Sequence, residues 1–132
     1  MPARRTAQSG SPFEESIGFS RALRIGAMTT VSGTAPVNSD GSSAGGADPE
    51  AQARRCLEII QSALHDVGVS LHDVVRTRIY LTDAADWEAV GRAHGEVFGA
   101  IRPASTMVVI AALLRPEWRV EIEADAYSPD LA

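Results

Sequence analysis

The feature that most constrains the fold is a strict alternation of side-chain types near the end of the chain. From residue 118 to residue 127, apolar side chains occupy every second position: Trp118, Val120, Ile122, Ala124 and Ala126. The side chains between them are charged or polar: Arg119, Glu121, Glu123, Asp125 and Tyr127. Successive side chains of a β-strand point to opposite faces of its sheet. The segment therefore predicts a strand with one face in a core and a second face that carries carboxylates.

Three further segments predict strands of the same sheet. Residues 74–81 alternate, with Val75, Thr77, Ile79 and Leu81 expected on the core face and Arg76, Arg78 and Tyr80 on the other. Short runs at 20–25 and 28–32 flank Gly26-Ala27 and predict a β-hairpin, which Gly33 to Pro36 end. Residues 105–113 predict another strand, and residues 38–47, rich in Gly and Ser, predict a loop.

Two segments predict amphipathic helices. The first begins at Asp48-Pro49, where the carboxylate accepts hydrogen bonds from free backbone N–H groups and proline suits the first helical position, and it ends at Gly68. The second begins at Asp83 and ends at Gly99. Its buried stripe is expected to hold Trp87, Val90, His94, Val97 and Phe98.

This order of elements predicts one sheet with two helices packed on one face. The opposite face, with its arginines, glutamates and tyrosine, is expected to be covered by other copies of the chain. Residues 1–16 are polar and are expected to form a flexible N-terminal arm, which leaves 17–132 as a single domain.

Composition excludes several classes of function. The 132-residue chain carries a formal net charge of −5, and all of its 12 basic residues are arginines, without a block of positive charge. Nucleic acid is therefore not an expected partner. No apolar run approaches the roughly 18 residues of a membrane span, and no signal peptide is visible, so we expect a cytoplasmic protein. A single cysteine, Cys56, and three scattered histidines predict neither a disulfide nor a metal site.

Several motifs resemble those of the RidA/YjgF family, also called endoribonuclease L-PSP-like. They are Ser32-Gly33-Thr34-Ala35-Pro36, Asp73-Val74-Val75-Arg76-Thr77, Tyr80-Leu81-Thr82-Asp83, Arg102-Pro103-Ala104-Ser105-Thr106 and Val120-Glu121-Ile122-Glu123. The resemblance covers residues 17–127. It implies a chorismate-mutase-like α/β (α+β) fold with one mixed sheet, a homotrimer, and small-molecule pockets between subunits. It also implies imine or enamine hydrolysis without a cofactor.

The family's site residues carry over unevenly. Gly33 matches the position whose backbone N–H holds substrate, and Glu121 matches the glutamate that orients the attacking water. Ser105 stands where the deaminases have the arginine that grips the substrate carboxylate, and Met107 replaces a frequent cysteine. The resemblance further implies pocket positions for Ser20, which aligns with a tyrosine, for Thr106, and for Gly91 and His94 on the second helix.

The loss of that arginine leaves three readings. A serine cannot replace the bidentate, charged grip of a guanidinium, so the chain is expected to act on an altered substrate or one held differently. Arg102, Arg76 and Arg78 are candidates to compensate, although Arg76 and Arg78 are expected to pair with carboxylates of the sheet. The alternatives are a metabolite-binding protein without turnover and, with less support, an endoribonuclease.

Overall fold

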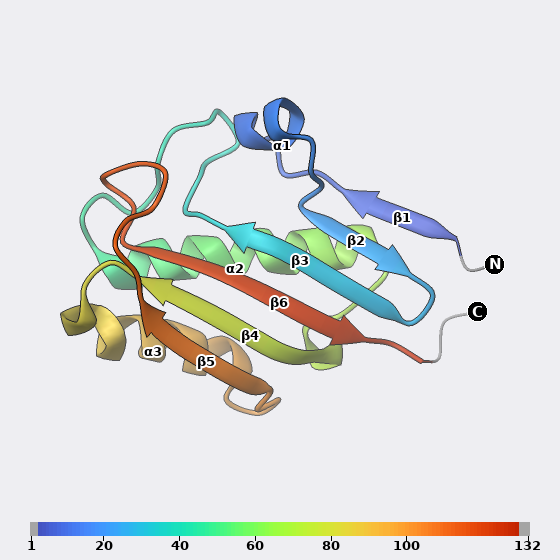
Figure 1. Ribbon diagram of the computed structural model, residues 1–132. Helices are drawn as coiled ribbons and strands as arrows, with labels where there is room; N and C mark the ends of the chain where they lie inside the picture. Colours follow the sequence, from blue (N-terminus) through green and yellow to red (C-terminus); the bar gives the residue numbers. More distant parts are fainter. Residues whose placement is uncertain (1–2, 130–132) are drawn as a thin grey trace.

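The computed structural model describes residues 3–129 and contains a six-stranded sheet with two long helices on one face (Figure 1). The strands are β1 (Arg4–Ala7), β2 (Ala22–Ile25), β3 (Met28–Thr34), β4 (Val74–Leu81), β5 (Ala104–Val109) and β6 (Val120–Tyr127). The helices are α1 (Pro12–Ile17), α2 (Pro49–Asp66) and α3 (Trp87–Phe98), with short 3-10 turns η1 (Leu71–Asp73) and η2 (Ala84–Asp86).

The sheet is mixed, as predicted. Its strand order is β1-β2-β3-β6-β4-β5, and all neighbours are antiparallel except β4 and β5. Helices α2 and α3 both pack behind the sheet, which leaves its other face open in Figure 1. None of the described helices is long and apolar enough to cross a membrane.

The predicted core is confirmed in its main parts. Val120, Ile122, Ala124 and Ala126 of β6 are fully buried, and the side chains between them point to the open face. Asp48 caps α2 by accepting a hydrogen bond from the backbone N–H of Glu50 at 3.0 Å, as the Asp-Pro pair predicts.

Two apolar residues differ from their predicted positions. Val75 is 48% exposed because a bulge between Val74 and Arg76 shifts the register of β4, so Val74 takes the buried position. Trp87, expected on the buried stripe of the second helix, is 59% exposed, and it is the first residue of α3, which follows η2.

The segment 1–16, expected to be a flexible arm, contributes regular structure within its described part. Residues Arg4–Ala7 pair with β2 as the edge strand β1. Ser11 then caps α1, Pro12 occupies its first turn, and Gly18 ends it in the left-handed conformation at φ 94°. The expected boundary at residue 17 therefore falls at the last residue of a helix.

Candidate functional site

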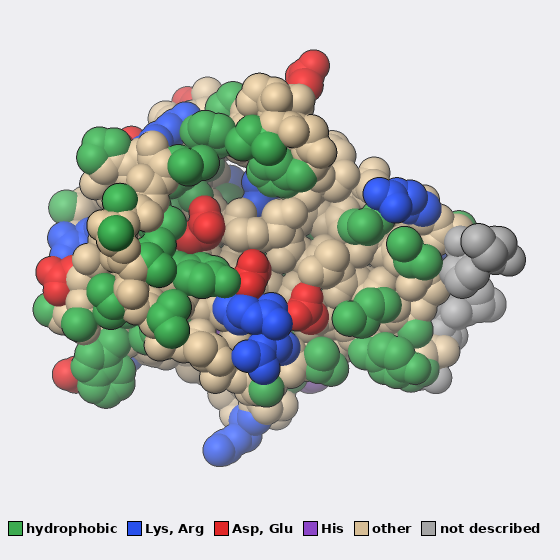
Figure 2. All heavy atoms as spheres, in the orientation of Figure 1, with side chains coloured by type: hydrophobic (Ala, Val, Ile, Leu, Met, Phe, Trp, Pro, Cys, Tyr) green, Lys and Arg blue, Asp and Glu red, His purple; other side chains and the backbone are tan. Residues whose placement is uncertain are grey.

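A cavity opens on the exposed face of the sheet, beside α1. The cavity and its open mouth together hold about 430 Å3 of empty space. Phe13, Ile17, Phe19, Leu114 and Trp118 form much of its wall. Arg21, Gly33 and Glu121 supply polar groups. Figure 2 shows this hollow, with hydrophobic side chains at its rim and charged side chains within it and below it.

Glu121 projects from β6 into this cavity and is half-buried. Burial raises the pKa of its carboxyl above the usual value of 4.5, the guanidinium of Arg21 opposes this shift, and the neighbouring Glu123 adds to it. A carboxylate whose pKa is raised is a stronger base, and general acid–base chemistry needs a group that readily accepts a proton.

The pH dependence of stability should report this shift. A carboxyl whose pKa is higher in the folded chain stabilises the fold below its unfolded pKa, and this contribution is lost as the pH rises through the folded pKa. We therefore expect the free energy of unfolding of the wild type, relative to that of Glu121→Gln, to fall as the pH rises from 4.5. Urea unfolding of both proteins at a series of pH values measures the difference. A constant difference would contradict the raised pKa.

Gly33 lies directly against the Glu121 carboxylate. A Cβ atom at residue 33 would stand 2.6 Å from Glu121 Oε2 and 3.1 Å from its Cδ. The register of β3 against β6 shifts between Val31 and Thr34, and this irregularity contains Gly33. Any side chain at residue 33 would occupy the space that the carboxylate needs, so these two predicted site residues come together.

Arg21 is a site residue that the sequence analysis missed. Its side chain is buried, with an ion pair from Nε to Glu14 Oε2 at 3.0 Å, and it lines the same cavity as Glu121. Nη1 donates to the carbonyl oxygen of Gly33 at 2.6 Å and to Thr34 Oγ1 at 3.2 Å. No local pattern marks Arg21, because its partners lie 7 to 13 residues away in the chain.

Ser105 does not meet Glu121 within one chain. The parallel register of β4 and β5 pairs Ser105 with Thr77, whose buried side chain lies on the helix side of the sheet. Thr77 Oγ1 lies 2.8 Å from Ser105 Oγ and 2.9 Å from His94 Nε2, which makes a continuous hydrogen-bonded chain of three side chains. Glu121 projects from the opposite face.

The other pocket positions that the resemblance implies on β5 and α3 also lie away from the cavity. Met107 packs against the main core from the helix side, whereas Thr106 accepts a hydrogen bond from Arg76 Nη2 at 3.1 Å. His94 stacks on Phe98 with ring centroids 4.7 Å apart, and burial lowers its pKa. Gly91 has nothing within 4 Å of the space that a Cβ would fill. None of these residues lines the cavity.

Ser20, which the resemblance implies to be a pocket residue, does not line the cavity, whereas its neighbour Phe19 does. Ser20 lines only a second hollow beside α1 and accepts a hydrogen bond from Gln8. The aromatic side chain at this end of the cavity is therefore that of Phe19, one position before Ser20.

The three arginines considered as replacements for the lost arginine do not line the cavity. Arg78 pairs with Asp125 at 3.1 Å and with Glu123 at 3.4 Å, as predicted, and Tyr80 donates to Glu123 at 2.8 Å. Arg76 bonds to Thr106 instead of a carboxylate. Arg102 is exposed at the turn that follows α3, with φ 57°.

Metal and thiol chemistry find no support in the part of the chain that the structure describes. Residues 3–129 contain no group of three or more His, Cys, Asp or Glu side chains that could hold a metal ion. Cys56 is completely buried in α2, and this burial raises the pKa of its thiol far above the usual range, which disfavours a thiolate.

Comparison with known proteins places this geometry in a family. The family described as "Endoribonuclease L-PSP" matches residues 11–128. The chain is 38% identical over 123 residues to the uncharacterised protein SCO2049 of Streptomyces coelicolor, covering 93% of this chain and 91% of that protein. It is 35% identical over 97 residues to the 3-aminoacrylate deaminase RutC of Acinetobacter baylyi, covering 74% and 76%.

A solved structure supports the same assignment. The crystal structure of Rv2704 from Mycobacterium tuberculosis, described as a member of the YjgF/YER057c/UK114 family, superposes with a TM-score of 0.86. The two chains are 47% identical, and the match covers 95% of this chain and 99% of Rv2704. The six-stranded sheet, the position of Glu121 against Gly33, and these matches agree, and the chain belongs to the endoribonuclease L-PSP (RidA/YjgF) family.

Proposed function

We propose that this protein hydrolyses a small imine or enamine, with Glu121 as the acid–base group. Water attacks the carbon of the C=N bond while Glu121 accepts a proton from it. The same carboxyl then passes a proton to the nitrogen, and the resulting carbinolamine breaks down to a carbonyl compound and ammonia. The observation that carries the proposal is a half-buried carboxyl with a raised pKa, held against Gly33 in a largely apolar cavity.

The matched relatives support the reaction class. RutC of Acinetobacter baylyi is named a 3-aminoacrylate deaminase. Its substrate is an enamine by that name, and the enamine and imine forms differ only in the position of one proton. Either the substrate of this protein or the way it is held is expected to differ, because Ser105 stands in place of the carboxylate-binding arginine.

A second copy of the chain would complete the site. Strand β5 is an edge of the sheet, with unpaired backbone groups along one side. Val108 and Val109 on this strand are 42% and 54% exposed, and with Trp87 they line a shallow apolar hollow. A homotrimer in which this edge packs against a neighbour would bring Ser105 of one subunit toward Glu121 of the next.

Ammonia release from a panel of freshly generated imines tests the proposal. We expect Glu121→Gln to lower the rate by about 100-fold to 10,000-fold, the usual contribution of a general acid–base group. Asp125→Asn is the matched control, because Asp125 lies on the same strand and face but bonds to Thr30 and Arg78, away from the cavity.

Two results would contradict the proposal. Equal rates in wild type and Glu121→Gln would remove Glu121 from the mechanism. An active protein whose mass in sedimentation equilibrium equals the 14.0 kDa of one chain would exclude the intersubunit site.

A metabolite-binding protein without turnover is the second candidate, favoured by the absence of an arginine at residue 105. Thermal stabilisation by metabolites that are not consumed would support it, since a ligand that binds only the folded state stabilises it by mass action. The net charge of −5 argues against the ribonuclease activity in the family's name, because binding of a phosphate backbone needs clustered positive charge.

A further inference from the structure

Arg21 has donor groups that its structural bonds leave free. A guanidinium carries five N–H donors in a planar fork. Nε donates to Glu14 and Ser9, and Nη1 donates to the Gly33 carbonyl and to Thr34. Within residues 3–129, Nη2 makes no hydrogen bond, and it is not completely buried. These two N–H groups belong to a side chain that lines the cavity, so they are the donors with which Arg21 can bind an acceptor there.

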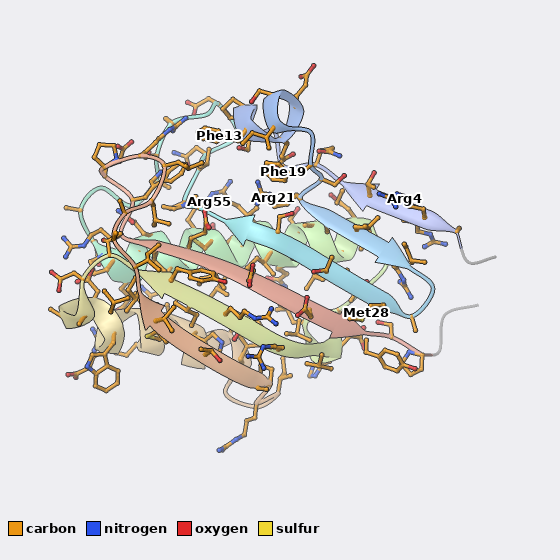
Figure 3. The ribbon with its side chains drawn as sticks, viewed as in Figure 1. Arg4, Phe13, Phe19, Arg21, Met28 and Arg55 are labelled. Carbon is orange, nitrogen blue, oxygen red and sulfur yellow. The ribbon has the colours of Figure 1, made fainter. Side chains whose placement is uncertain are left out.

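The walls around this arginine suit a flat, apolar body. The Arg21 guanidinium lies over the Phe19 ring at 5.3 Å from its centroid, and Phe13 meets Trp118 edge-on at 5.9 Å. Figure 3 shows Phe13, Phe19 and Arg21 facing the same space beneath α1, while Arg4 and Met28 lie at the far end of the sheet. Arg55 is near Arg21 in this view, but it bonds to the Val37 carbonyl and does not line the cavity.

We propose that Arg21 binds the carboxylate of a small planar ligand, whose body packs between Phe13, Phe19 and Trp118. This inference rests on the proposed function and deepens it, because it names the substrate class as a planar carboxylate held by Arg21 in place of an arginine on β5. Glu14 already neutralises much of the charge of Arg21. The selectivity for an anion therefore comes from directed, charge-assisted hydrogen bonds from Nη2.

Benzoate and its neutral isostere benzamide test the proposal in equilibrium binding by calorimetry. We expect the wild type to bind benzoate at least about tenfold more tightly than benzamide, the usual worth of a charge-assisted hydrogen bond. Arg21→Gln combined with Glu14→Gln removes the anchor without leaving a buried charge, and its preference should fall to about onefold. Glu14→Gln alone is the matched control and should keep the preference, because it retains Nη2.

Three outcomes overturn the proposal: no binding of benzoate to the wild type, no preference for benzoate over benzamide in the wild type, or a benzoate preference that survives in the folded double variant. Urea unfolding checks that the double variant is folded. Binding does not require turnover, so the two proposals fail separately. Loss of ammonia release with a retained Arg21-dependent preference would contradict only the hydrolysis, and the reverse result would contradict only the anchor.

Discussion

Arg21→Gln, with Glu14 left in place, is expected to lower the free energy of unfolding by about 3–5 kcal/mol, the usual cost of removing one partner of a buried ion pair. Arg21 and Glu14 side chains are only 5% and 4% exposed, so the remaining carboxylate would stay out of water without its counter-charge. The substitution also removes donors from the carbonyl of Gly33 and from Thr34. Urea denaturation followed by circular dichroism measures the loss.

A double-mutant cycle separates the charge from the packing. Glu14→Gln should cost less than Arg21→Gln, because an uncharged amide can still contact Ser9, which donates to Glu14 through its N–H and its hydroxyl. Arg21→Gln combined with Glu14→Gln should be more stable than Arg21→Gln alone. Simple additivity of the two losses would show that the pair is not energetically coupled.

Gly33→Ala is expected to lower both stability and activity. The new Cβ would lie 2.6 Å from Glu121 Oε2, so the carboxylate or the strand must move. Overpacking in a closed core costs about 1–3 kcal/mol of folding free energy, and the loss here is expected at or below the lower end, because the carboxylate ends a flexible side chain that can turn aside. A displacement of a reacting group by about 1 Å can cost about 100-fold in rate. We expect both losses, measured by urea unfolding and by ammonia release.

Shortening the Glu121 side chain, which the new methyl group at residue 33 would contact, supplies the control. Adding Glu121→Ala to Gly33→Ala removes the carboxylate that the new methyl group meets, so stability should recover toward that of Glu121→Ala alone. A double variant that stays as unstable as Gly33→Ala would place the strain in the β3 backbone instead. This stability measurement does not depend on turnover.

The elements that follow from local patterns were predictable. The alternation over residues 118–127 places the faces of β6 correctly, and Asp48-Pro49 places the start of α2, because both signals act through neighbouring residues. Gly33 and Glu121 were identified through the family motifs, and their contact gives a physical reason for the glycine.

Features that depend on distant pairing were not predictable. Strand β1 has only four residues, and most of them are exposed, so they show no apolar pattern that predicts a strand. Pairing with β2 defines it in the folded chain. The face of Ser105 depends on the parallel register between β4 and β5, which a sequence pattern on β5 alone does not determine. Arg21 reads as an ordinary polar strand residue, and its burial results from Glu14 and Gly33, which approach it only in the folded chain.

The bonds of Arg21 have a consequence for how the cavity comes into being. This one side chain joins α1, through Glu14, to the end of β3, through Gly33 and Thr34. A helix of six residues has no independent stability in water, so α1 holds its shape only while it is docked. The part of the cavity wall that α1 supplies and the position of Arg21 in the cavity therefore form in a single cooperative event. Local unfolding of α1 would disrupt both together.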